Sequence, residues 1–382
     1  MKHLLLGKSG LRVSELCLGA MTFGEEWGWG ASKEESHKTF NAYVDAGGNF
    51  IDTANNYTGG TSEKYVGEFI TGDRERFVLA TKYTSNTRRG DPNAGGNHRK
   101  NMTQSLEASL KRLNTDYIDL YWVHAWDPLT PIEEMLRALD DMVRTGKILY
   151  IGISDAPAWI VSQANTLANL RGWTEFAGIQ IEYSLIERTP ERELLPMAGA
   201  LDIGVTAWSP LGGGVLTGKY NKNNNEEEEQ QQRQKQNTSS SSSSMVVTQE
   251  GNSRLEVQSG LASRFLNDRN ISIAQEVSKI AKKIGRSAAQ VALNWIRQQN
   301  ITSLAWKNKN KIIPIIGARK ESQIKDNLAC LEFELTSEQM KRLNEVSPIE
   351  LGFPHDFLNS ERLKDIIYGG TYSLINNTDA VK

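Results

Sequence analysis

Short runs of apolar residues alternate along this chain with longer segments in which apolar residues recur every three or four positions. The short runs are rich in β-branched residues, which is typical of strands that are buried on both faces of a parallel sheet. Eight runs are predicted as strands: Glu15–Gly19, Asn49–Asp52, Phe77–Lys82, Ile118–His124, Ile148–Ser154, Gly178–Glu182, Gly204–Trp208 and Ile312–Ile316.

The segment Pro131–Val143 illustrates the helical pattern between these strands. Its apolar residues fall on one stripe, Pro131 suits the first helical position, and Gly146 favours termination shortly after the helix. Further helices are predicted over Lys33–Ala46, Thr61–Phe69, Met102–Leu113, Ile273–Ile284, Ser287–Gln298 and Glu321–Cys330.

Eight strand–helix alternations favour a closed (β/α)8 TIM barrel, with an open doubly wound sheet as the alternative. Residues 3–6 and 11–14 flank a Gly-rich turn and predict an N-terminal β-hairpin that could cover the barrel floor. Residues 221–250 are almost devoid of apolar side chains, which predicts a disordered low-complexity insertion after the seventh strand. We therefore expect one barrel domain over residues 1–350 and a C-terminal tail over residues 351–382.

Charge and composition narrow the class of protein. The 44 Lys and Arg residues nearly balance the 46 Asp and Glu residues, so nothing points to nucleic acid. Two cysteines, Cys17 and Cys330, are too few for a disulfide framework and favour a reducing compartment. The N-terminal apolar run is too short for a signal peptide or a membrane span. We expect a cytoplasmic protein that binds a small molecule, with no indication of its oligomeric state.

Ionisable residues end three consecutive predicted strands, at Asp52, Lys82 and His124, and Tyr57 follows Asp52 by five positions. The carboxyl ends of barrel strands meet at one mouth, so these four side chains should converge there. A phenol has an ordinary pKa of about 10, and an adjacent ammonium is expected to lower that pKa. Such a Tyr–Lys pair can protonate an alkoxide as it forms.

Other chemistries fit less well. Asp52 and His124 could ligate a metal, but a protonated lysine is a poor ligand and no further His or Cys has suitable spacing, so no metal is predicted. The segment 213–219 fits G-x4-G-K, yet Tyr220 follows where a P-loop has Ser or Thr. Its glycines could still bind phosphate through backbone amides. No G-x-G-x-x-G follows a strand, so a Rossmann cofactor site is not supported.

In motif order and spacing the chain resembles the aldo-keto reductase superfamily, from Leu6 to about Val346. The branch that it resembles includes aryl-alcohol dehydrogenase-like enzymes and potassium-channel β subunits. The motifs that carry the resemblance are LGKSGLRVSELCLGAMTFG, NFIDTANNY, LATK, DLYWVH, YIGIS, GIQIEYSL, AWSPLGGGVLTGKY and IIPIIGARKESQIKDN. The resemblance implies an NADP(H)-dependent enzyme that reduces aldehydes or ketones, with the cofactor extended across the barrel mouth.

Carried over to this sequence, the resemblance makes Tyr57 the general acid in reduction, with Lys82 and Asp52 tuning its pKa and His124 orienting the carbonyl. It also implies that Ser154 and Gln180 bond the nicotinamide amide and that Trp208 stacks on the ring. Further implied cofactor contacts are Met21, Thr22, Asp52, Ser209, Leu211, Gly212, Gly214, Lys219, Gly317, Arg319, Gln323, Asp326 and Asn327.

Several features bear on cofactor and substrate choice. Arg319, with Lys320 beside it, favours NADP over NAD. Asp155 departs from the Asn or Arg that the family often has beside the strand-five serine. The insertion interrupts the glycine-rich loop, which is expected to speed cofactor exchange, and Arg254 and Arg264 beyond it could reach the phosphates.

Aromatic residues after the strands suit aryl or medium-chain aldehydes, although loop packing explains them as well. The aromatic residues proposed as pocket walls are Trp27, Trp29, Tyr83 and Trp126. Two other functions fit the same residues: a cofactor-binding regulatory subunit like the channel β subunits, and a sugar or inositol dehydrogenase working in oxidation.

Overall fold

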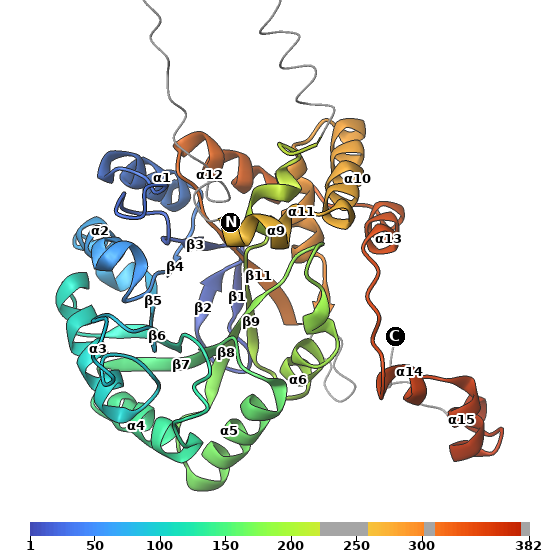
Figure 1. Ribbon diagram of the computed structural model, residues 1–382, viewed down its shortest axis with the longest axis horizontal. Coiled ribbons are helices and arrows are strands. Elements are labelled where there is room, and N and C mark those ends of the chain that lie inside the picture. Colours follow the sequence, from blue (N-terminus) through green and yellow to red (C-terminus); the bar gives the residue numbers. More distant parts are fainter. Residues whose placement is uncertain (222–258, 302–309, 376–382) are drawn as a thin grey trace, which may run out of the picture.

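A computed structural model describes residues 1–221, 259–301 and 310–375. Apart from Asn221, the insertion predicted at 221–250 lies outside the described residues. Eight parallel strands form a barrel that is ringed by helices (Figure 1). These strands are β3 (Cys17–Gly19), β4 (Phe50–Asp52), β5 (Val78–Tyr83), β6 (Ile118–Val123), β7 (Ile148–Ser154), β8 (Phe176–Glu182), β9 (Gly204–Trp208) and β11 (Asn310–Ile316).

Closure of the sheet decides between the two predicted architectures. Strand β11 pairs in parallel with β9, where Ile312 lies opposite Val205, and with β3, where Ile315 lies opposite Cys17. Because both edges of the sheet meet on β11, the (β/α)8 barrel is confirmed and the open doubly wound sheet is excluded. A short strand that the pattern did not predict, β10 (Asn300–Ile301), pairs antiparallel with β11.

The predicted N-terminal hairpin is confirmed and fills one end of the barrel. Strands β1 (His3–Leu5) and β2 (Arg12–Ser14) pair antiparallel. Leu6 and Val13 are fully buried and pack with Trp122 inside the barrel. Gly152 makes room for Trp122, since a Cβ at that position would lie 2.3 Å from the indole ring. The filled floor leaves the opposite mouth as the place for a site.

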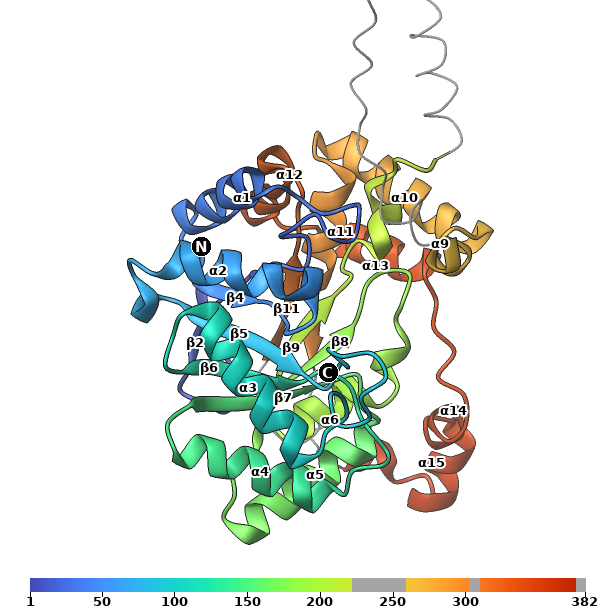
Figure 2. The ribbon, with the colours of Figure 1, turned by 60° about the vertical axis from the view of Figure 1, so that its left-hand side comes forward.

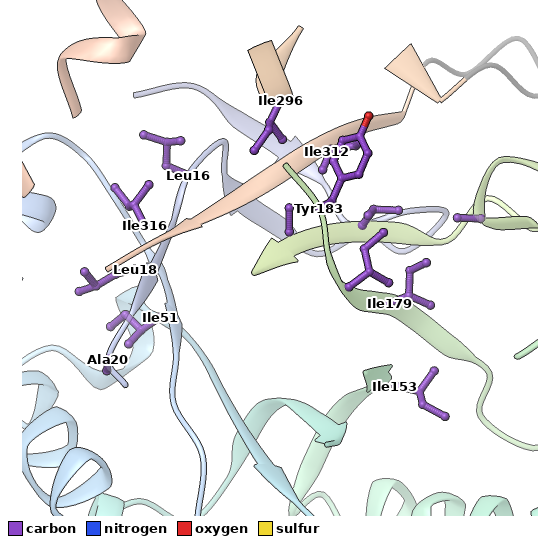
Figure 3. Close-up of a cluster of buried hydrophobic side chains, with 14 of the residues drawn as sticks. Leu16, Leu18, Ala20, Ile51, Ile153, Ile179, Tyr183, Ile296, Ile312 and Ile316 are labelled. Atoms are coloured by element: carbon purple, nitrogen blue, oxygen red, sulfur yellow. The ribbon is translucent and has the colours of Figure 1, made fainter. Parts of the chain in front are cut away.

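A second, larger apolar layer lies between the strands and the helices. Figure 3 shows part of it, including Leu18, Ile51 and Ile179, all almost fully buried. The surrounding helices are α1 (Lys33–Asp45), α2 (Thr61–Ile70), α3 (Arg99–Leu113), α4 (Ile132–Arg144), α5 (Ala158–Arg171), α6 (Leu194–Ala200), α9 (Ser259–Phe265), α10 (Asp268–Ile284), α11 (Ala288–Arg297), α12 (Glu321–Leu328) and α13 (Ser337–Val346).

Some helix ends differ from the prediction, at one of them because a side chain caps the helix. Helix α10 begins at Asp268, because the Asn267 side chain accepts the Asn270 N–H and caps the helix before its apolar stripe starts. Pro131 is the N-cap of α4 and not its first helical residue. The predicted helix to Cys330 ends earlier, and α12 continues as a 3-10 turn over Ala329–Glu332.

The predicted C-terminal tail contains two short helices, α14 (His355–Leu358) and α15 (Glu361–Tyr368), which the apolar pattern did not reveal. Both stand away from the barrel on an extended segment that follows α13 (Figures 1 and 2). Among the described helices, none combines the length and the apolar character needed to cross a bilayer.

Candidate active site

A cavity of about 800 Å³ opens at the carboxyl ends of the barrel strands. Asp52 ends β4, Ser154 ends β7 and Trp208 ends β9, and all three side chains line this cavity together with Tyr57 and His124. The predicted convergence of the chemically active residues at one mouth is therefore seen in the structure. Their chemical roles stay predictions.

Lys82 lies at the centre of the converging residues. Its side chain is fully buried within β5, and the ammonium forms an ion pair with the Asp52 carboxylate. It also donates hydrogen bonds to the Thr53 carbonyl at 2.8 Å and to the Tyr57 hydroxyl at 3.1 Å. An ammonium has three donors, so all of them are used. Lys82 does not line the cavity itself, and its hydrogen bond to Tyr57 joins it to a residue of the cavity wall.

The local backbone holds Tyr57 in place. Tyr57 begins a 3-10 turn in which Thr58 and Gly59 have positive φ values of 47° and 64°. The Thr58 hydroxyl donates to the Phe23 carbonyl at 2.6 Å and ties this turn to the loop after β3. The rings of Trp27 and His124 stand edge-on to the phenol, with centroids at 6.2 and 5.8 Å.

The sequence analysis expected a lowered pKa for Tyr57, and this expectation is wrong. Burial raises the pKa of Tyr57 above its ordinary value, and the Asp52 carboxylate adds to the rise, while the Lys82 ammonium opposes it without reversing it. Burial also acts against the charged form of Lys82, yet Asp52 and Tyr57 raise the Lys82 pKa overall. The pair therefore consists of a charged ammonium beside a neutral phenol that keeps its proton at neutral pH.

His124 is held by its own backbone and carries no charge at neutral pH. Its N–H donates to the Tyr83 carbonyl and to the Thr84 hydroxyl, both at 3.2 Å. The Thr84 hydroxyl in turn donates to the Asn97 side chain at 2.6 Å. Burial and the nearby Lys82 ammonium lower the pKa of His124 to about 3. A neutral imidazole has one ring N–H, which can donate a hydrogen bond to a substrate oxygen.

Most residues predicted to bind the cofactor line the same cavity. They are Met21, Thr22, Asp52, Ser154, Gln180, Trp208, Ser209, Leu211, Gly214, Lys219, Gly317, Arg319, Gln323, Asp326 and Asn327. Gly212 is the exception, and its contact with the cofactor stays a prediction. A Cβ on Gly212 would lie 2.2 Å from Ile186, so this glycine faces the core, and its neighbour Gly213 lines the cavity instead.

On one side of the cavity, side chains from different strands bind one another. The Gln180 amide donates to Asp52 at 3.0 Å, which links β8 to β4. The Trp208 indole N–H donates to the Asp155 carboxylate at 3.0 Å. Asp155 lines the cavity directly after Ser154, with a positive φ of 46°.

On the other side, polar side chains bind the start of a neighbouring helix or their own turns. Asp326 accepts hydrogen bonds from Ser287 at 2.8 Å and Gln290 at 2.7 Å. The Gln323 side chain accepts the Arg319 N–H at 2.9 Å. The first turn of α11 also lines this side, which the sequence interpretation missed. The capping box Ser-x-x-Gln at 287–290 marks that turn and could have drawn attention to it.

Of the four aromatic residues proposed as pocket walls, fewer lie at the cavity than expected. Trp29 lines the cavity and Trp27 packs on Tyr57. Tyr83 is a correction, because it is fully buried and stacks on Tyr121 in the outer core with centroids 5.3 Å apart. Successive strand residues face opposite ways, and Lys82 occupies the inward position beside it. Trp126 likewise packs on the outer core.

The two arginines expected to reach the phosphates give no support to that role. Arg264 forms ion pairs with Glu182 and Glu187 and is absent from the cavity wall, and Arg254 lies outside the described residues. Among the residues that the structure describes, no group of three or more His, Cys, Asp or Glu side chains could hold a metal ion.

The fold and this cavity define a TIM-barrel protein with a candidate site at the carboxyl ends of its strands. Residues 15–348 match the model of the Aldo/keto reductase family, and the chain belongs to that family, as the sequence motifs predicted. The chain is 36% identical to norsolorinic acid reductase of Emericella nidulans over 360 residues, covering 92% of this chain and 82% of the relative. It is 34% identical to aryl-alcohol dehydrogenase [NADP(+)] of Phanerodontia chrysosporium over 369 residues, covering 91% and 86%.

Proposed function

We propose that this protein is an NADP(H)-dependent reductase that converts aldehydes or ketones, aromatic ones in particular, to alcohols, with Tyr57 as the general acid. The observation that carries the proposal is the 3.1 Å contact between the Lys82 ammonium and the Tyr57 hydroxyl at the wall of the cavity. This contact joins a proton donor to a buried cation that stabilises the phenolate left behind.

Reduction of a carbonyl needs a hydride at the carbon and a proton at the oxygen. Bound NADPH supplies the hydride. The neutral His124 imidazole orients the carbonyl by donating its ring N–H to the oxygen. Tyr57 then gives its proton to that oxygen, and the Lys82 ammonium stabilises the phenolate. Asp52 keeps Lys82 charged and directed at the phenol through their ion pair.

The cavity suits a long phosphorylated cofactor. Gly213 and Gly214 have positive φ values of 62° and 93°, and a Cβ on Gly214 would press on the Lys219 side chain at 3.3 Å. A glycine turn beside a lysine fits a pyrophosphate, since bare backbone amides and a cation bind its oxygens. Arg319 at the far side of the cavity suits a 2′-phosphate and therefore NADP. One relative carries NADP(+) in its name.

Aromatic substrates fit the side of the cavity that holds Tyr57. Trp27 stands edge-on to the phenol and its ring centroid is 5.6 Å from that of Trp29. Trp29, which lines the cavity, offers apolar surface to an aryl group. The relatives named for aryl alcohols agree with this substrate class.

We also propose that residues 1–350 form the catalytic domain and that the protein acts in the cytoplasm on small molecules without nucleic acid or membrane partners. The two cysteines are free buried thiols, which agrees with a reducing compartment.

The test follows the absorbance of reduced nicotinamide with a panel of aromatic aldehydes, for the wild type and for Tyr57→Phe. We expect wild-type turnover with NADPH and a loss of about 10²- to 10⁴-fold in Tyr57→Phe, with NADPH still bound. Full turnover in Tyr57→Phe would contradict the acid role. A wild type that binds NADPH without turning over would favour the regulatory subunit, and faster alcohol oxidation at neutral pH would favour the dehydrogenase.

A further inference from the structure

Asp155 places a carboxylate beside the indole of Trp208. It directly follows Ser154 at the end of β7, and its oxygen accepts the Trp208 indole N–H at 3.0 Å. The backbone has a φ of 46° at Asp155, a left-handed conformation that Asp tolerates better than most residues. Because Asp155 and Trp208 both line the cavity, a charge on Asp155 acts on whatever ring lies against the indole.

The cations near Asp155 bind other carboxylates. Lys82 uses its donors on Asp52, Thr53 and Tyr57. Arg264 forms its ion pairs with Glu182 and Glu187. Within the described residues no cationic side chain forms an ion pair with Asp155 inside 4 Å. Burial raises the pKa of Asp155, which indicates that water screens the carboxylate only in part, while hydrogen bonds from Trp208 and Ser154 and the charges of Lys82 and Arg264 oppose the rise without reversing it. Its carboxylate therefore faces the cavity with hydrogen-bond donors around it but without a cation in direct contact.

We propose that Asp155 makes the site favour the oxidised over the reduced nicotinamide, by attracting the positive ring of NADP⁺ from its place beside Trp208. The inference rests on the proposed function, because it assumes that the ring lies against this indole. Loss of a hydride removes two electrons and one proton from NADPH and leaves a ring with one positive charge. The neutral ring of NADPH feels no comparable attraction.

The expected size follows from Coulomb's law in a partly wet cavity, where one charge pair changes affinity by about fivefold. For a two-electron couple, a fivefold preference for the oxidised form lowers the reduction potential of the bound cofactor by about 20 mV. Asp155 would thus make the bound NADPH a stronger reductant and bias the site towards carbonyl reduction. It would also slow release of NADP⁺.

The experiment measures the Kd of NADP⁺ and of NADPH separately by isothermal titration calorimetry on the full-length protein. The key variant is Asp155→Asn, which removes the charge but keeps an oxygen that can accept the Trp208 N–H. We expect the Kd of NADP⁺ to rise about fivefold and the Kd of NADPH to change by less than about twofold. Glu25→Gln is the matched control, because it removes the same charge from an exposed loop position outside the cavity wall.

Asp155→Ala separates charge from indole positioning. If charge is the cause, Asp155→Ala and Asp155→Asn shift the ratio of the two Kd values equally. An unchanged ratio in Asp155→Asn, equal weakening of both cofactors, or a shift seen only in Asp155→Ala would each overturn the inference. A wild-type protein that bound neither cofactor would overturn the proposed function itself. Binding of both cofactors with an unaltered ratio in Asp155→Asn would overturn only the role of Asp155.

Discussion

The two sides of the cavity are built in different ways. On the side of β4, β5 and β8, polar side chains bind across strands, as Lys82 does with Asp52 and Tyr57, and Gln180 with Asp52. On the side of α11 and α12, Asp326 binds the start of the neighbouring helix and other polar groups bind their own turns.

This difference indicates on which side of the cavity the free-energy effects of substitutions should be coupled and on which side they should be additive. Lys82, Asp52 and Tyr57 share partners in a buried site, so removing one changes the charge state and stability of the others. Arg319 and Lys219, on the opposite side, belong to separate elements with no hydrogen bond between them among those described. Their contributions to cofactor affinity should therefore add.

The largest effect is expected for Lys82→Met. It leaves the buried Asp52 carboxylate without its cation, so the free energy of unfolding should fall by about 3–5 kcal/mol. Turnover should be lost as well. Chemical denaturation and the absorbance assay measure the two effects. Adding Asp52→Asn should restore much of the lost stability without restoring turnover, and Lys219→Met should change stability by at most about 0.5 kcal/mol. Equal destabilisation by both lysine variants would remove the distinction between the two sides.

The second-largest effect is expected for His124→Gln, on how the free energy of unfolding changes at acidic pH. The pKa of His124 is about 3 in the folded protein, below its ordinary value of 6.5. Between these values the unfolded chain binds a proton that the folded chain does not, so the free energy of unfolding falls as the pH is lowered. His124→Gln should reduce that slope by about 1.4 kcal/mol per pH unit between about pH 6 and about pH 4. Denaturation curves across this range measure it, and parallel slopes would show that His124 is not desolvated.

A smaller, additive effect is expected on the opposite side. Arg319→Ala should raise the Kd of NADPH by about tenfold, through loss of a charged contact to the 2′-phosphate, and leave the Kd of NADH within about twofold. Combined with Lys219→Met, the two free-energy changes should add within about 0.5 kcal/mol. Calorimetric titration of the single and double variants measures this. Equal losses for NADPH and NADH would count against a 2′-phosphate contact.

The smallest effect is expected far from both sides, for removal of residues 351–382. In this tail the His355 ring forms an exposed hydrogen bond with the Glu193 carboxylate at 3.0 Å, and such surface contacts contribute little. The melting temperature of the shortened protein should stay within about 2 °C of the full chain, with turnover within about twofold. A drop of many degrees would mean that the barrel domain extends beyond residue 350.

Much of the fold could be predicted because the strands are continuous apolar runs and the helices carry one apolar stripe. The spacing of Asp52, Tyr57, Lys82 and His124 relative to strand ends was enough to predict that they converge, since all parallel strands of a barrel open to one mouth. Helix starts were less certain where a capping side chain, such as Asn267, lies ahead of the apolar stripe.

The sequence by itself thus determined the order of elements and the chemistry available at the mouth, because both depend on residue type and local spacing. Only the tertiary structure decided the direction of the Tyr57 pKa shift, the outward position of Tyr83 and the contact between Asp155 and Trp208. Desolvation depends on everything packed around a group. A contact between residues 53 positions apart depends on the register of β7, β8 and β9, which no local pattern encodes.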